Sequence, residues 1–252
     1  MRITFTGTAA AGGVPRYGCQ CIACAAARSQ EARRREPCSA FIETSDTRVL
    51  IDAGLMDLHE RFPAGSLDAI LLTHYHPDHV QGLFHLRWGV GPSLAIFGPP
   101  DKDGCADLYK NPGILEFNPL STFQSFHIGQ LQVTPLSLIH SKITFGYAIE
   151  TSSGKRFAYL TDTVGLPAKT LTFLQHWQPH AMAVDCSHPP QEIRPKNHND
   201  VTLALALIQQ INPGQAWLTH ISHNVDKWRM ETNFELPEKV FWAEDHLQIS
   251  LE

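Results

Sequence analysis

The chain has no run of apolar residues that approaches the ~20 needed to cross a membrane. Residues 1–5 lack the basic region, apolar stretch and cleavage site of a signal peptide. Positive charge is also scarce, because 20 Lys and Arg stand against 25 Asp and Glu. The net charge of -5 argues against a broad nucleic-acid surface, which needs a basic face. We therefore expect a cytoplasmic protein with no membrane contact and no stable nucleic-acid complex.

Nothing in the sequence divides the chain into parts, since it has no internal repeat, low-complexity tract or charged linker. Hydrophobic residues make up 43% and charged residues 18%, a balance that supports a large core and argues against disorder. We expect one domain that spans residues 1–252.

Disulfide bonds are not expected, although the chain has six cysteines. Cys19, Cys21 and Cys24 are crowded together, whereas the others are scattered along the chain, at Cys38, Cys105 and Cys186. This distribution favours reduced thiols, with the crowded three on a metal ion.

Short segments rich in Val, Ile, Leu, Phe and Thr predict many strands and few helices. The expected strands are 2–7, 39–44, 47–52, 69–73, 94–97, 130–136, 144–151, 156–161, 181–185 and 215–219. The expected helices are 20–35, 79–87, 167–177 and 200–211, with Pro167 in a first turn and Asp200 as an N-cap. This order predicts an α/β fold of two sheets with helices outside.

The run 74–79 places three imidazoles and a carboxylate within six residues, directly after the apolar strand 69–73. Neutral imidazole and carboxylate are the usual ligands of Zn, Mn, Fe or Ni. If His74, His76, Asp78 and His79 were only structural, several buried polar groups would need partners at once. A metal site is therefore the favoured interpretation.

Three further polar residues each follow an apolar run: His140, Asp162 and His220. With the first cluster they make too many ligands for one tetrahedral ion, but suit two ions that share a carboxylate. His74, His76 and His140 are expected to hold one ion. Asp78, His79 and His220 are expected to hold the other, and Asp162 to bridge. Such a centre favours an anionic substrate.

The order H-x-H-x-D-H, then single His, Asp and His after strands, resembles the metallo-β-lactamase superfamily. The resemblance implies an αβ/βα sandwich of two mixed β-sheets flanked by helices, with two metals at one edge. Asp52 resembles the acidic residue that supports the metal loop without ligating. The resemblance leaves β-lactam, thioester, lactone and phosphodiester hydrolysis open.

The cysteine motif C-x-C-x2-C supplies three thiolates, and a zinc site needs a fourth ligand. His223 is the best candidate, because it lies three residues after His220. A structural Zn(2+) on Cys19, Cys21, Cys24 and His223 would fasten the N-terminal loop to a loop that carries a metal ligand. The alternative is three idle thiols.

Five segments together resemble the PhnP-type cyclic phosphodiesterases of the carbon–phosphorus lyase pathway for phosphonate use: 13–24, 72–79, 84–89, 185–190 and 219–223. The resemblance implies hydrolysis of 5-phosphoribosyl 1,2-cyclic phosphate to ribose 1,5-bisphosphate, and of 2′,3′-cyclic nucleotides. It also implies two Mn(2+) ions at the active site, a separate structural zinc and a homodimer.

His198 is left over after both metal sites are filled, and segment 195–198 resembles the one that carries the family's catalytic histidine. The resemblance implies a general acid for the leaving oxygen, with Asp78 orienting the attacking water. Without this resemblance, His198 would be interpreted equally well as a solvated loop residue. His188 is expected to be structural, and Lys142 is the candidate for gripping a substrate phosphate.

Three other functions stay open. The tRNA 3′-processing endonucleases share the ligands, but they grip tRNA with a Gly/Pro-rich basic arm that this chain lacks. A thioester or lactone hydrolase should lack both the general acid and the cysteine site. A metal-binding or sensor protein without turnover would have lost a ligand first.

Overall fold

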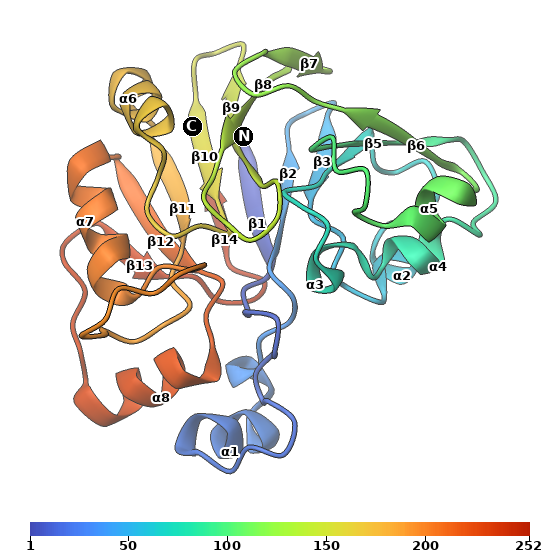
Figure 1. Cartoon of the computed structure of the whole chain (residues 1–252). Helices are drawn as coiled ribbons and strands as arrows, with labels where there is room; N and C mark the ends of the chain where they lie inside the picture. The colour runs from blue at the N-terminus through green and yellow to red at the C-terminus, as the bar shows by residue number, and fades with distance from the viewer.

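The computed structural model describes all 252 residues, and two seven-stranded β-sheets form its centre (Figure 1). In the first sheet the strands lie in the order β14-β1-β2-β3-β4-β5-β6. They are β14 (Gln248–Ser250), β1 (Arg2–Gly7), β2 (Ser39–Glu43), β3 (Arg48–Ile51), β4 (Ala69–Leu71), β5 (Leu94–Gly98) and β6 (Leu115–Pro119). Pairing is antiparallel from β14 to β3 and parallel from β3 to β6, so the sheet is mixed.

The second sheet has the order β13-β12-β11-β10-β9-β8-β7. Its strands are β13 (Val240–Trp242), β12 (Gln215–Thr219), β11 (Ala181–Asp185), β10 (Arg156–Leu160), β9 (Phe145–Thr151), β8 (Leu131–Ser137) and β7 (Phe126–Ile128). The four strands from β13 to β10 are parallel, and those from β10 to β7 are antiparallel. Parallel neighbours end at the same edge of a sheet, which gathers the loops that follow them.

The two sheets pack face to face around a core of 21 buried residues. Alternation along a strand sends successive side chains to opposite faces. In β3, Val49 and Ile51 belong to this inner core, whereas Leu50 belongs to a separate cluster under the outer helices. In β10, Phe157 and Tyr159 face the inner core and Leu160 faces outward.

Helices cover the outer faces (Figure 1). Those on the first sheet are short: α2 (Leu58–Arg61), α3 (Pro77–Val80), α4 (Leu83–Leu86) and α5 (Ala106–Lys110). Those on the second sheet are α6 (Ala168–Trp177), α7 (Val201–Ile211) and α8 (His223–Thr232). Helix α1 (Ile22–Ser29), followed by the 3-10 turn η1 (Glu31–Arg33), packs against α8. This arrangement confirms the expected sandwich of two mixed sheets flanked by helices.

Most expected elements are present, and two helices differ. The expected helix 20–35 ends at Ser29, because the backbone of Arg35 pairs with Val14, with N to O distances of 2.8 and 3.2 Å. The expected helix 79–87 is split into α3 and α4. Gly82 lies between them, where a Cβ would stand 2.2 Å from the carbonyl oxygen of Leu55.

Helices 167–177 and 200–211 are confirmed within a residue. Asp200 caps α7 as expected, because its side chain accepts the Leu203 N–H at 2.8 Å. The sequence did not predict β6, β7, β13, β14, α2, α5 or α8. The longest helix has 11 residues, and none is long and apolar enough to span a membrane.

Candidate active site

A cleft of about 560 Å³ lies at the edge where β4, β8, β10, β11 and β12 end. The loops after these strands carry the polar residues that the sequence singled out. His76, Asp78, His140, Asp162, His198 and His220 all line the cleft. The structure therefore brings together side chains as far apart in the sequence as His74 and His220, which are separated by 146 positions.

One group of side chains converges at the first expected ion position: His74, His76, His140 and Asp162, with ligand atoms within 4.8 Å of one another. His74 Nε2 lies 2.8 Å from His76 Nδ1, and His140 Nε2 lies 3.1 Å from the same atom. Asp162 Oδ2 lies 3.6 Å from His74 Nε2 and 3.7 Å from His140 Nε2.

A second group, Asp78, His79 and His220, converges beside the first, also within 4.8 Å. Asp78 Oδ2 lies 3.3 Å from His79 Nε2 and 3.8 Å from His220 Nε2. Asp162 reaches this group as well, with Oδ2 3.4 Å from His79 Nε2 and Oδ1 3.3 Å from His220 Nε2. Asp162 therefore lies between the two groups, as the sequence predicted for a bridging carboxylate.

Neighbouring residues orient the histidines so that one ring nitrogen faces the cluster. Asp52 is fully buried, accepts from His79 Nδ1 at 2.7 Å, and accepts the Thr73 N–H at 2.8 Å. The Thr73 hydroxyl donates to Asp52 and so accepts from His74 Nδ1 at 3.0 Å. This places Asp52 behind the cluster, where it supports the loop.

The other side of the cluster is held in the same way. The Ser187 hydroxyl donates to Asp185 Oδ1 at 3.0 Å and so accepts from His220 Nδ1 at 2.7 Å. His140 Nδ1 donates to the carbonyl oxygen of Asn197 at 3.0 Å. In each of these rings Nδ1 is bonded away from the cluster, so Nε2 faces into it and is the atom that could ligate a metal.

The residues present fit divalent metal ions. His79 Nε2 and His220 Nε2 are buried and have no hydrogen-bond partner. Nε2 of His74 and Nε2 of His140 both face Nδ1 of His76, at 2.8 and 3.1 Å, and one Nδ1 proton cannot fully satisfy both. Buried acceptors without a donor are costly, and a cation is the group that satisfies them together.

The carboxylates of the cluster are ionised. Burial acts to raise the pKa of Asp78, but hydrogen bonds and charge from His220 and His79 outweigh it and hold the pKa well below its usual range. The pKa of Asp162 is lowered in the same way, against burial, by the charges of His220 and His79. Both side chains are therefore available as anionic ligands.

His198 lies over this cluster and is held by Asp185. Its Nδ1 donates to Asp185 Oδ2 at 2.7 Å, and its ring stacks on that of His220 with centroids 4.9 Å apart. Burial acts to lower the pKa of His198, but the charge and hydrogen bond of Asp185 outweigh it and raise the pKa to about 9. The Asp185 carboxylate thus favours the protonated imidazole, and its hydrogen bond to Nδ1 leaves Nε2 to face the cleft.

The cysteine motif and His223 also come together, with ligand atoms within 4.8 Å of one another. Cys19 Sγ lies 3.5 Å and Cys21 Sγ 3.6 Å from His223 Nδ1. None of the six cysteines forms a disulfide bond. Three thiols and an imidazole at this spacing fit a tetrahedral zinc ion.

Lys142 and His188 differ in where they lie relative to the cleft. The Lys142 ammonium lies 3.4 Å from Asp101 and is not among the residues that line the cleft, so its contact with a substrate phosphate stays a prediction. His188 lines the cleft, 6.1 Å from the His198 ring between centroids. The sequence missed Asp185 and Ser187 as supports, although Asp185 ends a buried strand like the proposed ligands do.

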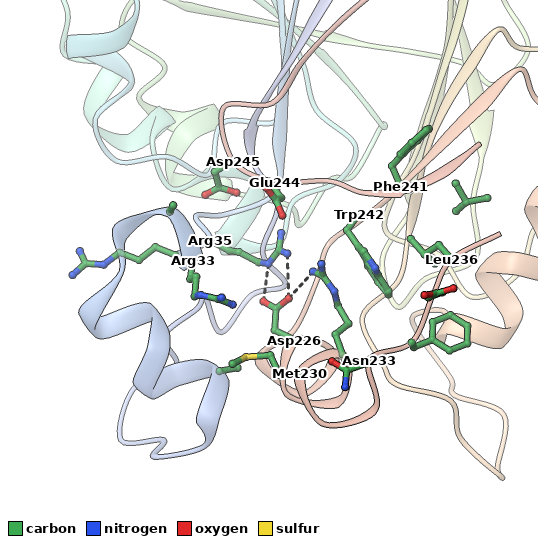
Figure 2. Close-up of a pocket in the computed structure, with 17 residues that line it drawn as sticks. Arg33, Arg35, Asp226, Met230, Asn233, Leu236, Phe241, Trp242, Glu244 and Asp245 are labelled. Atoms are coloured by element: carbon green, nitrogen blue, oxygen red, sulfur yellow. Dashed lines mark hydrogen bonds and ion pairs between the residues drawn. The ribbon is translucent and has the colours of Figure 1, made fainter. Parts of the chain in front are cut away.

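A larger cavity of about 700 Å³ lies elsewhere, between α1, α8 and the C-terminal strands (Figure 2). Its polar centre is Asp226, which pairs with Arg35 at 2.7 Å and Arg229 at 3.1 Å. Arg35 is almost fully buried and also donates to Thr8 and to the Ala243 carbonyl. These groups satisfy one another, and the metal-binding clusters lie outside this cavity.

Residues 47–221 match the family described as beta-lactamase superfamily domain. The chain is 29% identical over 245 aligned positions to an octanoyltransferase of Porphyromonas gingivalis, covering 89% of this chain and 46% of that protein. It is 32% identical over 119 positions to a ribonuclease Z of Methanopyrus kandleri, covering 44% and 43%. The chain thus spans less than half the length of either relative.

Among solved structures, a diphosphatase of the PhnP family superposes with a TM-score of 0.82 at 24% identity, covering 99% of this chain and 97% of that one. At that identity the likeness is one of fold.

Proposed function

This chain belongs to the metallo-β-lactamase superfamily, a family with the fold of metal-dependent hydrolases, and on that premise we propose that it is a phosphodiesterase for small cyclic phosphates. Its proposed substrate is 5-phosphoribosyl 1,2-cyclic phosphate, hydrolysed to ribose 1,5-bisphosphate in phosphonate catabolism, with 2′,3′-cyclic nucleotides as further substrates. The observation that carries the proposal is His198, which Asp185 holds through Nδ1 with its ring stacked on that of His220. A phosphodiester needs such an acid, because an alkoxide leaves poorly without a proton.

We propose that His74, His76 and His140 hold one divalent ion and that Asp78, His79 and His220 hold the other, with Asp162 shared. Manganese is the proposed metal here, and zinc at Cys19, Cys21, Cys24 and His223. The two ions of the active site would supply positive charge for the phosphoryl oxygens and would lower the pKa of the attacking water.

The residues of the chain do the rest. Water adds to phosphorus, the bond from phosphorus to ribose O2 breaks, and the phosphate stays on C1; the proton that the water loses passes to solvent, from which His198 is reprotonated after the reaction. His198 Nε2–H gives its proton to the departing O2, while Asp185 keeps the ring in place through Nδ1. The Asp78 carboxylate, which lines the cleft, orients the water for in-line attack. A five-membered cyclic ester arrives with its geometry preset, which reduces the cost of orientation.

The size of the cleft supports a small substrate. Its volume of about 560 Å³ is within the range for sugar phosphates and nucleotides. The chain lacks the basic arm expected of a tRNA-processing endonuclease, and its net charge is -5. Because of the match to a ribonuclease Z, precursor tRNA is included as a test substrate, but it is not the proposed substrate.

A thioester hydrolase is the second candidate, favoured by the match to a protein named octanoyltransferase. An acyl thioester needs no proton on its thiolate leaving group, since a thiol is a much stronger acid than an alcohol. His198 would then have no catalytic task. The two candidates therefore differ in what loss of His198 does.

The experiment is a substrate panel with protein of known metal content. We expect turnover of ribosyl 1,2-cyclic phosphate, 2′,3′-cyclic nucleotides and bis(p-nitrophenyl) phosphate, and little with octanoyl thioesters or precursor tRNA. Preferential thioester hydrolysis would replace the proposal with the second candidate. Efficient trimming of precursor tRNA would count decisively against a small substrate.

A further inference from the structure

The active-site cleft extends beyond the metal-binding cluster to the cysteine site. Its lining includes Arg16, Ser222, His223 and Asn224 as well as the catalytic residues. Arg16 is the only Lys or Arg in this lining. The cleft therefore has one fixed positive charge that the proposed reaction does not use.

We propose that Arg16 and Ser222 form a subsite for a second phosphate of the substrate, separate from the phosphate that is cleaved. This inference rests on the proposed function. It assigns recognition of the 5-phosphate of the proposed substrate to the cysteine-rich loop and the start of α8.

The Arg16 guanidinium is free to bind an anion. Arg16 makes no ion pair, whereas Arg35 and Arg61 are each paired with a carboxylate. The polar contact of its guanidinium is with His223 Nε2, 3.3 Å from Nη1. Its side-chain contact is therefore with the cysteine site and not with His198 or the proposed active-site ligands, although all of them line one cleft.

The loop presents Arg16 in a defined position. Its backbone N–H donates to Cys24 Sγ at 3.4 Å, and its carbonyl oxygen accepts from Arg28 at 3.3 Å. Its Cγ and Cδ lie 3.8 Å from where a Cβ on Gly12 would stand, so the stem runs along the cleft lining.

Ser222 supplies a second group at the same end of the cleft. Its hydroxyl is buried without a hydrogen-bond partner, although Ser222 is the N-cap of α8 and the oxygen of such a residue normally accepts a backbone N–H of the first turn. The N–H groups of Val225 and Asp226 bond the Ser222 carbonyl, which leaves those of His223 and Asn224 without a carbonyl in the helix. A phosphate oxygen would satisfy the hydroxyl and face the positive end of α8.

A matched pair of substrates tests the subsite: ribose 1,2-cyclic phosphate with and without the 5-phosphate. In Arg16→Ala we expect kcat/KM for the phosphorylated substrate to fall about 10- to 100-fold, mainly through KM, as for loss of a charge-assisted contact. The loss should be confined to that substrate. Arg16→Lys should recover part of it, and Ser222→Ala should give a smaller loss of the same kind.

Arg33→Ala is the matched control. Arg33 lies in the same N-terminal region, bonds Gln30 at 2.6 Å, and lines the cavity of Figure 2 instead of the cleft. The Arg33→Ala variant removes the same positive charge as Arg16→Ala, and it should leave kcat/KM unchanged for both substrates. Zinc content equal to the wild type in every variant shows that the cysteine site is intact.

The outcomes separate the two levels of the argument. If the wild type hydrolyses neither sugar phosphate nor bis(p-nitrophenyl) phosphate, the proposed function fails and the subsite fails with it. If both sugar phosphates are hydrolysed and Arg16→Ala affects them equally, or affects neither, the subsite alone is overturned.

Discussion

Asp185 Oδ2 accepts a hydrogen bond from His198 Nδ1 at 2.7 Å, and the same oxygen accepts the Thr163 N–H at 3.0 Å. Its other oxygen accepts from the Ser187 hydroxyl, which in turn holds His220 Nδ1 at 2.7 Å. One fully buried carboxylate thus positions the proposed acid and, through Ser187, a proposed metal ligand. This link between proton donor and metal cluster leads to the first two predictions.

Replacing the proposed acid should lower the rate without lowering metal content. We expect His198→Ala to lose roughly 10²–10⁴ in kcat on alkyl phosphodiesters, the usual contribution of a general acid. The loss should shrink for p-nitrophenyl esters, whose leaving group needs no proton. Steady-state kinetics on both esters, with metal analysis, makes the comparison. Equal losses on the two esters would mean that His198 positions substrate and donates no proton.

Removing the charge of Asp185 should lower the pKa of His198. A general acid works only while it is protonated, so activity falls as pH rises through its pKa. Since Asp185 raises the pKa of His198 to about 9, Asp185→Asn should move the alkaline fall of kcat/KM to lower pH. The two profiles are compared at equal measured metal content, so that the effect of the metals on the pKa is common to both. An unchanged alkaline limb would remove Asp185 from this role.

Metal content should follow the two ligand sets independently. Elemental analysis should find about three divalent ions per chain if the proposed ligand counts hold. In His76→Ala we expect loss of active-site metal and of activity on every substrate, with the zinc of the cysteine site retained. Loss of zinc together with the active-site metal would show that the two sites are not independent.

The cysteine site should contribute more to stability than to chemistry. Cys21→Ala should lower stability by about 3 kcal/mol, comparable to loss of a cross-link, and so lower Tm by roughly 6–12 °C. Thermal unfolding measures this change, and kcat on bis(p-nitrophenyl) phosphate should change far less. A variant with unchanged Tm would contradict a structural zinc.

Thiol titration gives a second view of the cysteine site. With zinc bound, Cys105 should react alone, because it is only partly buried. After chelation, the partly exposed Cys19 and Cys21 should react as well. Cys38 is the internal control, since burial raises the pKa of its thiol to about 12 and should keep it unreactive. Reaction of Cys19 and Cys21 before chelation would argue against a bound zinc.

The inner strands and the metal-binding cluster were predictable because each has a strong local pattern. Buried strands such as 181–185 are apolar throughout, and the proposed ligands follow such strands directly. Sequence patterns did not predict elements whose structure depends on tertiary contacts. Helix α8 is polar along its length and was not predicted, although it begins after Ser222 and ends before Asn233 in the left-handed conformation.

The supports of the site were out of reach for a different reason. Asp185 contacts His198 and Ser187 contacts His220 across 13 and 33 positions, and these contacts depend on how β11 and β12 lie beside each other. The position of Arg16 likewise depends on His223, 207 positions away. No local pattern in the sequence encodes these pairs, whereas H-x-H-x-D-H encodes its own proximity.

The most direct test of the central claim is ³¹P NMR of 5-phosphoribosyl 1,2-cyclic phosphate incubated with manganese-loaded protein. The account predicts that the cyclic phosphate resonance is replaced by that of a monoester on C1, giving ribose 1,5-bisphosphate, and that His198→Ala slows the conversion. A cyclic phosphate that persists with fully metal-loaded protein, while the same protein hydrolyses an octanoyl thioester, would contradict it.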